Sequence, residues 1–145
     1  YLLPDGKTIV SFKGKGIDDS VYTSDDGHEV DVPIILLVNG ESASASEVLT
    51  GALKDNAWAT IVGEKTFGKG IAQGIFNLPD GSGLKLTTAY YYTPSGECIH
   101  KLGIEPDVTV ELDESLKNKV TVTEEEDNQL QKAISILQEE KNDAE

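Results

Sequence analysis

The chain has 145 residues, 38% of them hydrophobic, which is enough for one globular unit with its own core. Twelve lysines, no arginine and 26 acidic residues give a net charge of −14, so electrostatic repulsion argues against nucleic acids and anionic membrane surfaces as partners. Cys98 is the single cysteine, which excludes an intrachain disulfide, and no Cys/His spacing suits a metal, so we expect no cofactor.

The sequence begins at Tyr1, contains no methionine and carries no secretory signal, so it reads as a mature product or a piece of a longer protein. Its longest apolar run, residues 33–38, is too short to span a bilayer. We therefore expect no membrane insertion by this segment.

The first half of the chain predicts strands around one helix. Residues 8–13 and 20–24 are short segments separated by glycines, as in an edge hairpin. Residues 34–38 are apolar on both alternating faces, as in a central parallel strand covered by helices on each side. Apolar residues at helical spacing over 48–53 and a strand candidate at 59–63 complete a strand–helix–strand unit of the α/β class.

The second half predicts a hairpin and then one more strand. Residues 72–78 and 84–92 flank a Pro-Asp-Gly turn, and residues 108–112 alternate between apolar and polar. These segments complete a core that we expect to span residues 1–112.

An acidic linker and helix are expected over residues 113–145. Thr123 and Glu126 match a capping box, and four apolar residues follow at helical spacing, which predicts an amphipathic helix: Leu130, Ala133, Ile134 and Leu137. Eleven acidic residues and four lysines fall within residues 111–145, so half of the net charge lies there. This helix is either a solvated acidic face or a docking surface.

The stretch 39–47, Asn-Gly-Glu-Ser-Ala-Ser-Ala-Ser-Glu, lies between the buried strand and the helix. Open α/β sheets place their sites at this edge, and the unpaired amides of a helix's first turn can stabilise an oxyanion. Yet Ser44 and Glu47 also match a capping box, in which the serine only caps the start of the helix. Spacing leaves Ser42, Ser44 and Ser46 equally open as nucleophiles.

A serine nucleophile needs a base, and His28 and His100 stand alone in polar contexts, so the base would be a lysine or a carboxylate. Lys69 lies between two glycines and precedes apolar residues, where burial would favour the neutral amine that a base requires. Gln73 follows four residues later and has an amide that can hold that amine. The alternative reading is a solvated lysine and an ordinary polar strand residue.

Several segments together resemble the C-terminal processing, or tail-specific, peptidase family. They are residues 39–47, then Gly-Glu-Lys-Thr-Phe-Gly-Lys-Gly at 63–70 with Gln73, Leu-Lys-Leu-Thr-Thr-Ala at 84–89, Tyr-Thr-Pro-Ser-Gly at 92–96 and Gly-Ile-Glu-Pro-Asp at 103–107. The resemblance covers about residues 2–112. It implies a crotonase-like α/β core with a mixed, mostly parallel sheet flanked by helices, to which the C-terminal amphipathic helix is added.

The resemblance also implies roles for individual residues. Ser44, the middle serine, would be the nucleophile, Lys69 the general base, and Gln73 the residue that orients the base. The amide of Ala45 would be one oxyanion-hole donor. The implied reaction is cleavage of protein or peptide substrates near their C-termini by a Ser–Lys dyad, in an extracytoplasmic setting such as the cell envelope, periplasm or secreted fraction, with a homo-oligomer possible.

Two parts of the family pattern are not in this sequence: the Asp-Leu-Arg-x-Asn-x-Gly-Gly stretch, whose glycine amide supplies the second oxyanion donor, and a PDZ domain. Loss of one such donor costs about 10²–10³ in turnover, so we expect this chain alone to have little or no activity. Two other readings stand beside the peptidase: a noncatalytic peptide-binding module, and an assembly domain that uses the terminal helix.

Overall fold

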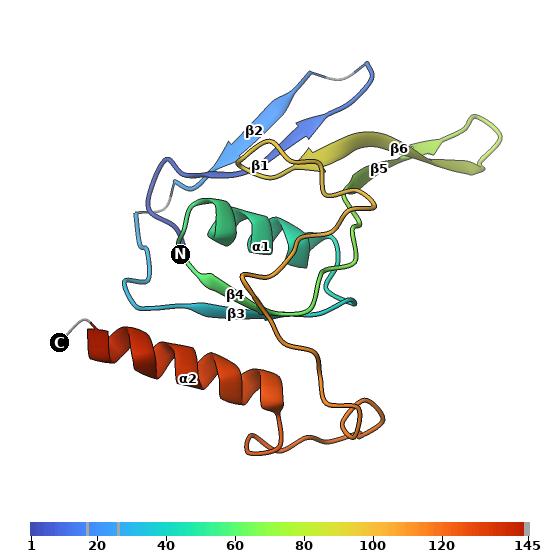
Figure 1. Cartoon of the computed structure of the whole chain (residues 1–145). Coiled ribbons are helices and arrows are strands. Elements are labelled where there is room, and N and C mark those ends of the chain that lie inside the picture. The colour runs from blue at the N-terminus through green and yellow to red at the C-terminus, as the bar shows by residue number, and fades with distance from the viewer. Residues whose placement is uncertain (17, 26, 144–145) are drawn as a thin grey trace.

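Two β-sheets lie on opposite sides of one helix in the computed structural model, which describes residues 1–16, 18–25 and 27–143. Figure 1 shows α1 (Ala45–Asp55) between the two sheets, and α2 (Asn128–Asp143) on the far side of the lower sheet. Ala52 and Leu53 of α1 form a buried cluster with Leu3, against which Trp58 packs. The predicted α/β class is confirmed.

The upper sheet is antiparallel and has the strand order β2-β1-β6-β5. Its strands are β1 (Thr8–Lys13), β2 (Ser20–Thr23), β5 (Ile71–Asn77) and β6 (Gly83–Tyr92). The edge hairpin and the second hairpin predicted from the sequence are both present. The β5–β6 hairpin projects away from the rest of the chain (Figure 1).

The β5–β6 turn is held by a carboxylate. The Ser82 N–H and hydroxyl both donate to Asp80 Oδ1, at 3.0 and 2.6 Å. These donors stabilise the charged carboxylate and so lower the pKa of Asp80. The Pro-Asp-Gly segment thus forms a turn that is closed by hydrogen bonds between Asp80 and Ser82.

The lower sheet is parallel and has the order β3-β4-β7, with β3 at Ile35–Val38, β4 at Thr60–Gly63 and β7 at Val108–Thr109. The predicted strand–helix–strand unit is therefore β3, α1 and β4. β7 is shorter than expected because β4 ends at Gly63, whose φ of 126° turns the chain beside the Val38 carbonyl and leaves no strand for β7 to pair with.

One detail of the predicted sheet is wrong. Among the described residues, three of the five strand pairings are antiparallel, and the strands divide into two sheets instead of one mixed, mostly parallel sheet. Short turns can join only antiparallel neighbours, whereas parallel pairing needs a crossover such as α1. The two predicted hairpins therefore account for more of the strand pairings than the apolar strand β3 does.

The C-terminal helix is amphipathic, as predicted, but begins later than its capping box suggested. Asp127 Oδ1 accepts the N–H groups of Gln129 and Leu130, both at 3.0 Å, and so caps α2. Thr123 and Glu126 instead close a separate turn before the helix. None of the helices in the described ranges has the length and apolar character needed to cross a membrane.

Helix α2 packs on the outer face of the parallel sheet. Ala133 is buried, and Gln129 Nε2 and Asn128 Nδ2 donate to the carbonyls of Val110 and Glu111, at 2.7 and 2.8 Å. The parallel sheet is therefore covered by α1 on one face and by α2 on the other, as expected for an apolar central strand (Figure 1).

Candidate active site

Ser44 occupies the turn between β3 and α1, where it is the N-cap of the helix. Its backbone has φ 58° and ψ −112°, a conformation that non-glycine residues avoid and that costs on the order of 1–3 kcal/mol. Ser42 and Ser46, the other two serines of the run, do not have positive φ. The structure therefore distinguishes the middle serine by its strained backbone.

Glu47 holds this turn and a second loop together. Its side chain is 0% exposed, and each carboxylate oxygen accepts two hydrogen bonds. Oε2 accepts the N–H groups of Ser44 at 3.0 Å and Lys69 at 2.8 Å. Oε1 accepts the Thr66 hydroxyl at 2.7 Å and the Gly68 N–H at 2.6 Å. Four donors compensate for removing the carboxylate from water.

The loop that carries Lys69 is fixed from its other side by Thr66. The Thr66 hydroxyl, which donates to Glu47, accepts the Ile104 N–H at 2.7 Å, and the Thr66 N–H donates to the Ile104 carbonyl at 3.1 Å. The Phe67 N–H donates to the Ser42 carbonyl at 3.0 Å. Residues 66–69 are therefore tied to the serine turn and to residue 104 at once.

Two glycines allow this loop to lie against a neighbouring backbone. A Cβ at Gly70 would lie 2.5 Å from the His100 nitrogen, and one at Gly68 would lie 2.9 Å from the Gly103 nitrogen. Gly68 also has φ 90°, which favours glycine. The glycines on both sides of Lys69 thus serve close backbone packing.

The structure brings the backbones of Ser44 and Lys69 to one carboxylate oxygen but does not join their side chains. Lys69 is exposed and makes no ion pair with the described residues. The expectation that Lys69 is buried is wrong: the flanking glycines are buried, but the lysine between them is exposed. Gln73 lies on β5 and is exposed too.

Gln73 lies next to an irregularity in the β5–β6 ladder. Ala72 faces Ala89 and Gln73 faces Thr87, so Thr88 is an extra residue on β6. Bulges of this kind bend strands and re-aim side chains near functional sites. The bulge separates the Lys69 end of β5 from the projecting hairpin.

Ala45 begins α1, directly after the strained serine. Its N–H has no hydrogen-bond partner among the described residues, whereas the N–H groups of Ser46 and Glu47 donate to the carbonyls of Ala43 and Ser44. Ala45 is also exposed. An accessible, unpaired amide next to Ser44 is what an oxyanion donor requires.

Sequence reasoning missed two parts of this arrangement, Glu47 beyond its capping role and Thr66. The capping contact exists, since Glu47 accepts the Ser44 N–H, but three of its four donors come from residues 66–69. The only sequence signal was a charged residue placed on the side of the helix that should be apolar. No local pattern identifies partners about twenty positions away.

We expect Glu47→Gln to lower the free energy of unfolding by about 2–4 kcal/mol, because the amide NH₂ would face the N–H groups of Ser44 and Lys69. Urea unfolding followed by Trp58 fluorescence measures this change. Glu41→Gln is the matched control, since Glu41 is exposed in the same turn and should change stability by less than about 0.5 kcal/mol. Equal unfolding curves for the two variants would contradict the account of Glu47.

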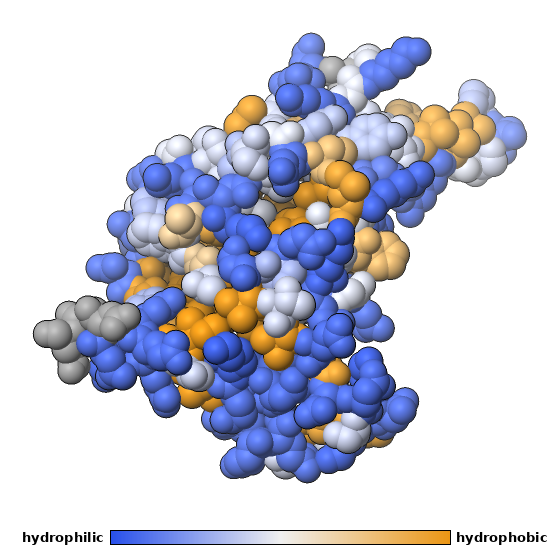
Figure 2. Space-filling model, in the orientation of Figure 1, coloured by the Kyte–Doolittle hydropathy of each residue, from blue (hydrophilic) through white to orange (hydrophobic). Residues whose placement is uncertain are grey.

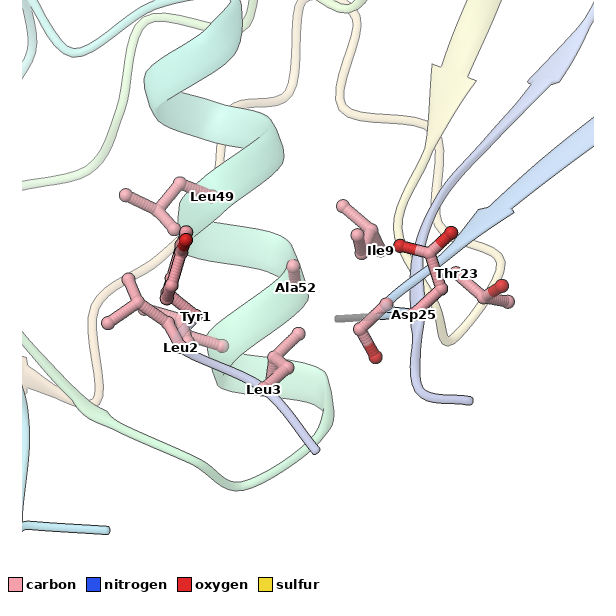
Figure 3. A pocket seen from close by; sticks show the side chains of 10 residues that line it. Tyr1, Leu2, Leu3, Ile9, Thr23, Asp25, Leu49 and Ala52 are labelled. Carbon is pink, nitrogen blue, oxygen red and sulfur yellow. The ribbon is translucent and has the colours of Figure 1, made fainter. Parts of the chain in front are cut away.

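An open pocket of about 300 Å³ lies on the other side of α1. Figure 3 shows its apolar wall, formed by the N-terminal residues and α1, facing Ile9, Thr23 and Asp25. Its described lining contains none of the four predicted site residues. Within the described ranges, no group of three or more His, Cys, Asp or Glu residues is arranged to hold a metal ion.

Comparison with known proteins points to one family. The profile of "Peptidase family S41" matches residues 1–110. The carboxyl-terminal-processing protease of a Synechocystis species is 49% identical over 109 residues, which are 75% of this chain and 25% of that protein. The chloroplastic C-terminal processing peptidase of Tetradesmus obliquus is 46% identical over 112 residues, which are 76% and 24% of the two chains. The chain therefore spans about a quarter of the length of these curated relatives.

Solved structures agree with the observed fold. The photosystem II D1 C-terminal processing protease matches with a TM-score of 0.71 and 42% identity, over 76% of this chain and 28% of that one. A lipoprotein from Streptococcus agalactiae matches with a TM-score of 0.70 over 95% of this chain and 46% of that one, at 21% identity, which supports the fold alone. The second match extends well beyond the part that the family profile covers.

Proposed function

The chain belongs to peptidase family S41, and from this premise we propose that it is the catalytic core of a serine endopeptidase that cleaves protein substrates near their C-termini. The observation that carries the proposal is the strained Ser44, whose backbone shares one Glu47 oxygen with the backbone of Lys69. The names of the relatives support processing at C-termini as the reaction.

In the proposed reaction, the Ser44 hydroxyl attacks the scissile carbonyl carbon while its proton passes to the neutral Lys69 amine. The Ala45 N–H stabilises the oxyanion of the tetrahedral intermediate. The intermediate collapses when Lys69 returns the proton to the leaving amine, and an ester on Ser44 remains. Water, deprotonated by Lys69, then hydrolyses the ester and releases the carboxylic acid product.

Gln73 is proposed to orient Lys69 through its side-chain amide. Lys69 lies two residues before β5, Gln73 lies on β5 directly after the bulge, and both side chains are exposed. Water around a lysine favours the charged ammonium form, which cannot accept a proton from a serine. We therefore propose that further residues of a longer protein, or the bound substrate, cover Lys69 in the working enzyme.

We propose that this chain alone has little or no peptidase activity. The Ala45 amide is one oxyanion donor, and the sequence lacks the glycine-containing stretch from which the family draws the second. We further propose a crotonase-like arrangement, a division of the chain into a peptidase core over residues 1–112 and an acidic linker with a C-terminal helix over residues 113–145, an extracytoplasmic location and homo-oligomers as assemblies. The chloroplast location in the name of the Tetradesmus obliquus relative applies to that protein alone.

A noncatalytic peptide-binding module is the second candidate function. Exposure of Lys69 favours it, because the described residues do not shield this side chain from water as an acyl-transfer site shields its base. The strained Ser44 and the unpaired Ala45 amide favour the peptidase, since a purely binding module has no need of either.

Trapping the acyl-enzyme separates these two functions. The longer protein is mixed with p-nitrophenyl acetate, quenched in acid within seconds, digested and analysed by mass spectrometry. We expect one acetyl group on the peptide that contains residues 39–53, at Ser44. An acetyl group on Ser42 or Ser46, or a failure to label this peptide while p-nitrophenol is released, would refute Ser44 as the nucleophile.

A further inference from the structure

Strand β5 leaves one edge of the antiparallel sheet open. It pairs with β6 on one side, and no described strand pairs with its other side. Three hydrogen bonds show which residues face β6: the Gly70 carbonyl accepts the Tyr91 N–H at 2.9 Å, the Ala72 carbonyl accepts the Thr88 hydroxyl at 3.4 Å, and the Leu78 N–H donates to the Ser82 carbonyl at 2.8 Å.

These three residues all have even numbers, and the extra residue of the bulge lies on β6, so the alternation along β5 is unbroken. The backbone groups of the odd-numbered residues therefore point to the open edge. Ile71, Gln73, Ile75 and Asn77 each present an N–H and a carbonyl there. The row of free groups begins two residues after Lys69.

An open edge of this kind is usually protected. Proteins shorten such strands or place lysine, proline or other charged residues on them to prevent pairing with foreign strands. The other edge strand, β2, has four residues, whereas β5 has seven. Its sequence, Ile-Ala-Gln-Gly-Ile-Phe-Asn, contains no charged residue and no proline, although the chain carries 38 charged residues.

The side chains beside this edge are apolar and exposed. Ile75 is 73% exposed, and Phe76 faces Leu84 across the hairpin, with both more than two-fifths exposed. Leu86 follows on the same face as Leu84. Figure 2 shows apolar surface on this projecting hairpin. Exposed apolar patches that adjoin free backbone groups mark sites for an extended polypeptide.

We propose that the open edge of β5, from Ile71 to Asn77, binds an extended apolar segment of the polypeptide substrate by strand addition. Main-chain hydrogen bonds supply the affinity. Ile75 and Phe76 point to opposite faces of the sheet, and each contacts side chains of the bound segment on its own face. The inference rests on the proposed function, which identifies the occupant as substrate. Because β5 begins two residues after Lys69, substrate is favoured over other partners. An unfolded segment fits, because a folded protein has few free strand edges to offer.

Hydrogen exchange on the ¹⁵N-labelled 145-residue chain tests the proposal. Ser44→Ala removes any cleavage, and the probe is an unstructured decapeptide of alternating valine and threonine. We expect the peptide to slow exchange at the amides of Ile71, Gln73 and Ile75 by about tenfold or more. The amides of Ala72 and Gly74, which face β6, should already exchange slowly without it.

Variants at one position give an independent measurement by fluorescence anisotropy with the same peptide, labelled with dye. Ile75→Pro removes an edge N–H and leaves the ladder to β6 intact, so we expect about tenfold weaker binding. Ile75→Thr keeps that N–H and should weaken binding by no more than about threefold. If Ile75→Pro fails to fold, hydrogen exchange on the parent chain still decides.

Two results would overturn the proposal directly: no peptide binding up to about 1 mM, or protection of amides on β2 instead of β5. A third is protection of the β5 edge amides without peptide that increases with protein concentration, which would identify a second copy of the chain as the occupant. The outcome is independent of the catalytic assignment, because neither measurement uses the Ser44 hydroxyl. Edge protection without acylation of Ser44 would refute only the peptidase, and acylation without edge protection only the strand addition.

Discussion

Ser44→Ala in the longer protein should abolish cleavage of an unfolded polypeptide, with kcat/KM falling by at least about 10⁴-fold, because no other atom can form the acyl-enzyme. Stability should change little, since the Glu47 carboxylate bonds the Ser44 backbone N–H, which alanine retains. The measurement is the initial rate of cleavage of a fluorogenic, unstructured peptide. Binding of that peptide should survive the substitution.

Ser42→Ala and Ser46→Ala are the matched controls for this prediction. The Ser42 hydroxyl accepts the Asn39 N–H at 3.1 Å, so its loss should weaken the turn while leaving the chemistry intact. Ser46 is exposed in the first turn of α1. If Ser44→Ala kept its activity while one of the controls lost it, the nucleophile would be Ser42 or Ser46. That result would contradict our assignment.

Lys69→Ala should lower kcat/KM by about 10³–10⁴-fold, as loss of a general base does. Lys69→Arg should be as inactive as alanine, because a guanidinium keeps its proton and cannot accept another. The two variants together distinguish a base from a mere positive charge. Rates measured with the same fluorogenic peptide as for Ser44→Ala would provide both values.

Lys65→Ala is the control for Lys69. Lys65 is exposed in the same loop and forms a surface ion pair with Glu105 at 2.7 Å, which should be worth no more than about 1 kcal/mol. We expect it to retain nearly full activity. If Lys69→Arg were active, or if Lys65→Ala were as damaged as Lys69→Ala, the proton-transfer role of Lys69 would be untenable.

Local sequence patterns predicted most of the elements. Alternation and turn residues placed β1, β2, β5 and β6, and apolar spacing placed α1 and α2, because these signals depend on neighbours within a few positions. The start of α2 was misplaced since Thr123 and Glu126 satisfy the capping pattern in a turn that does not continue as helix. Pairing between distant strands, such as β1 with β6, had no signal at all.

The sequence named candidate site residues, but it did not indicate the contacts that join their loops. The family resemblance selected Ser44 and Lys69, yet it does not indicate that Glu47 contacts both backbones, or that Lys69 is exposed. Glu47 reads as a cap because its first partner is three residues away. Its other partners follow from how residues 66–69 pack on α1, which is a property of tertiary structure.

Because Glu47 bonds to both Ser44 and Lys69, the serine turn and the lysine loop form one unit, and neither can be moved to another protein without the other. A designer who grafts Ser44 and Lys69 onto another scaffold by matching only their positions would lose the strained serine backbone and the loop geometry. Glu47, Thr66 and Gly68 would have to travel with them, together with a neighbouring backbone equivalent to residue 104. The smallest portable form of the proposed site is therefore a buried hydrogen-bond network that carries the Ser44 and Lys69 side chains.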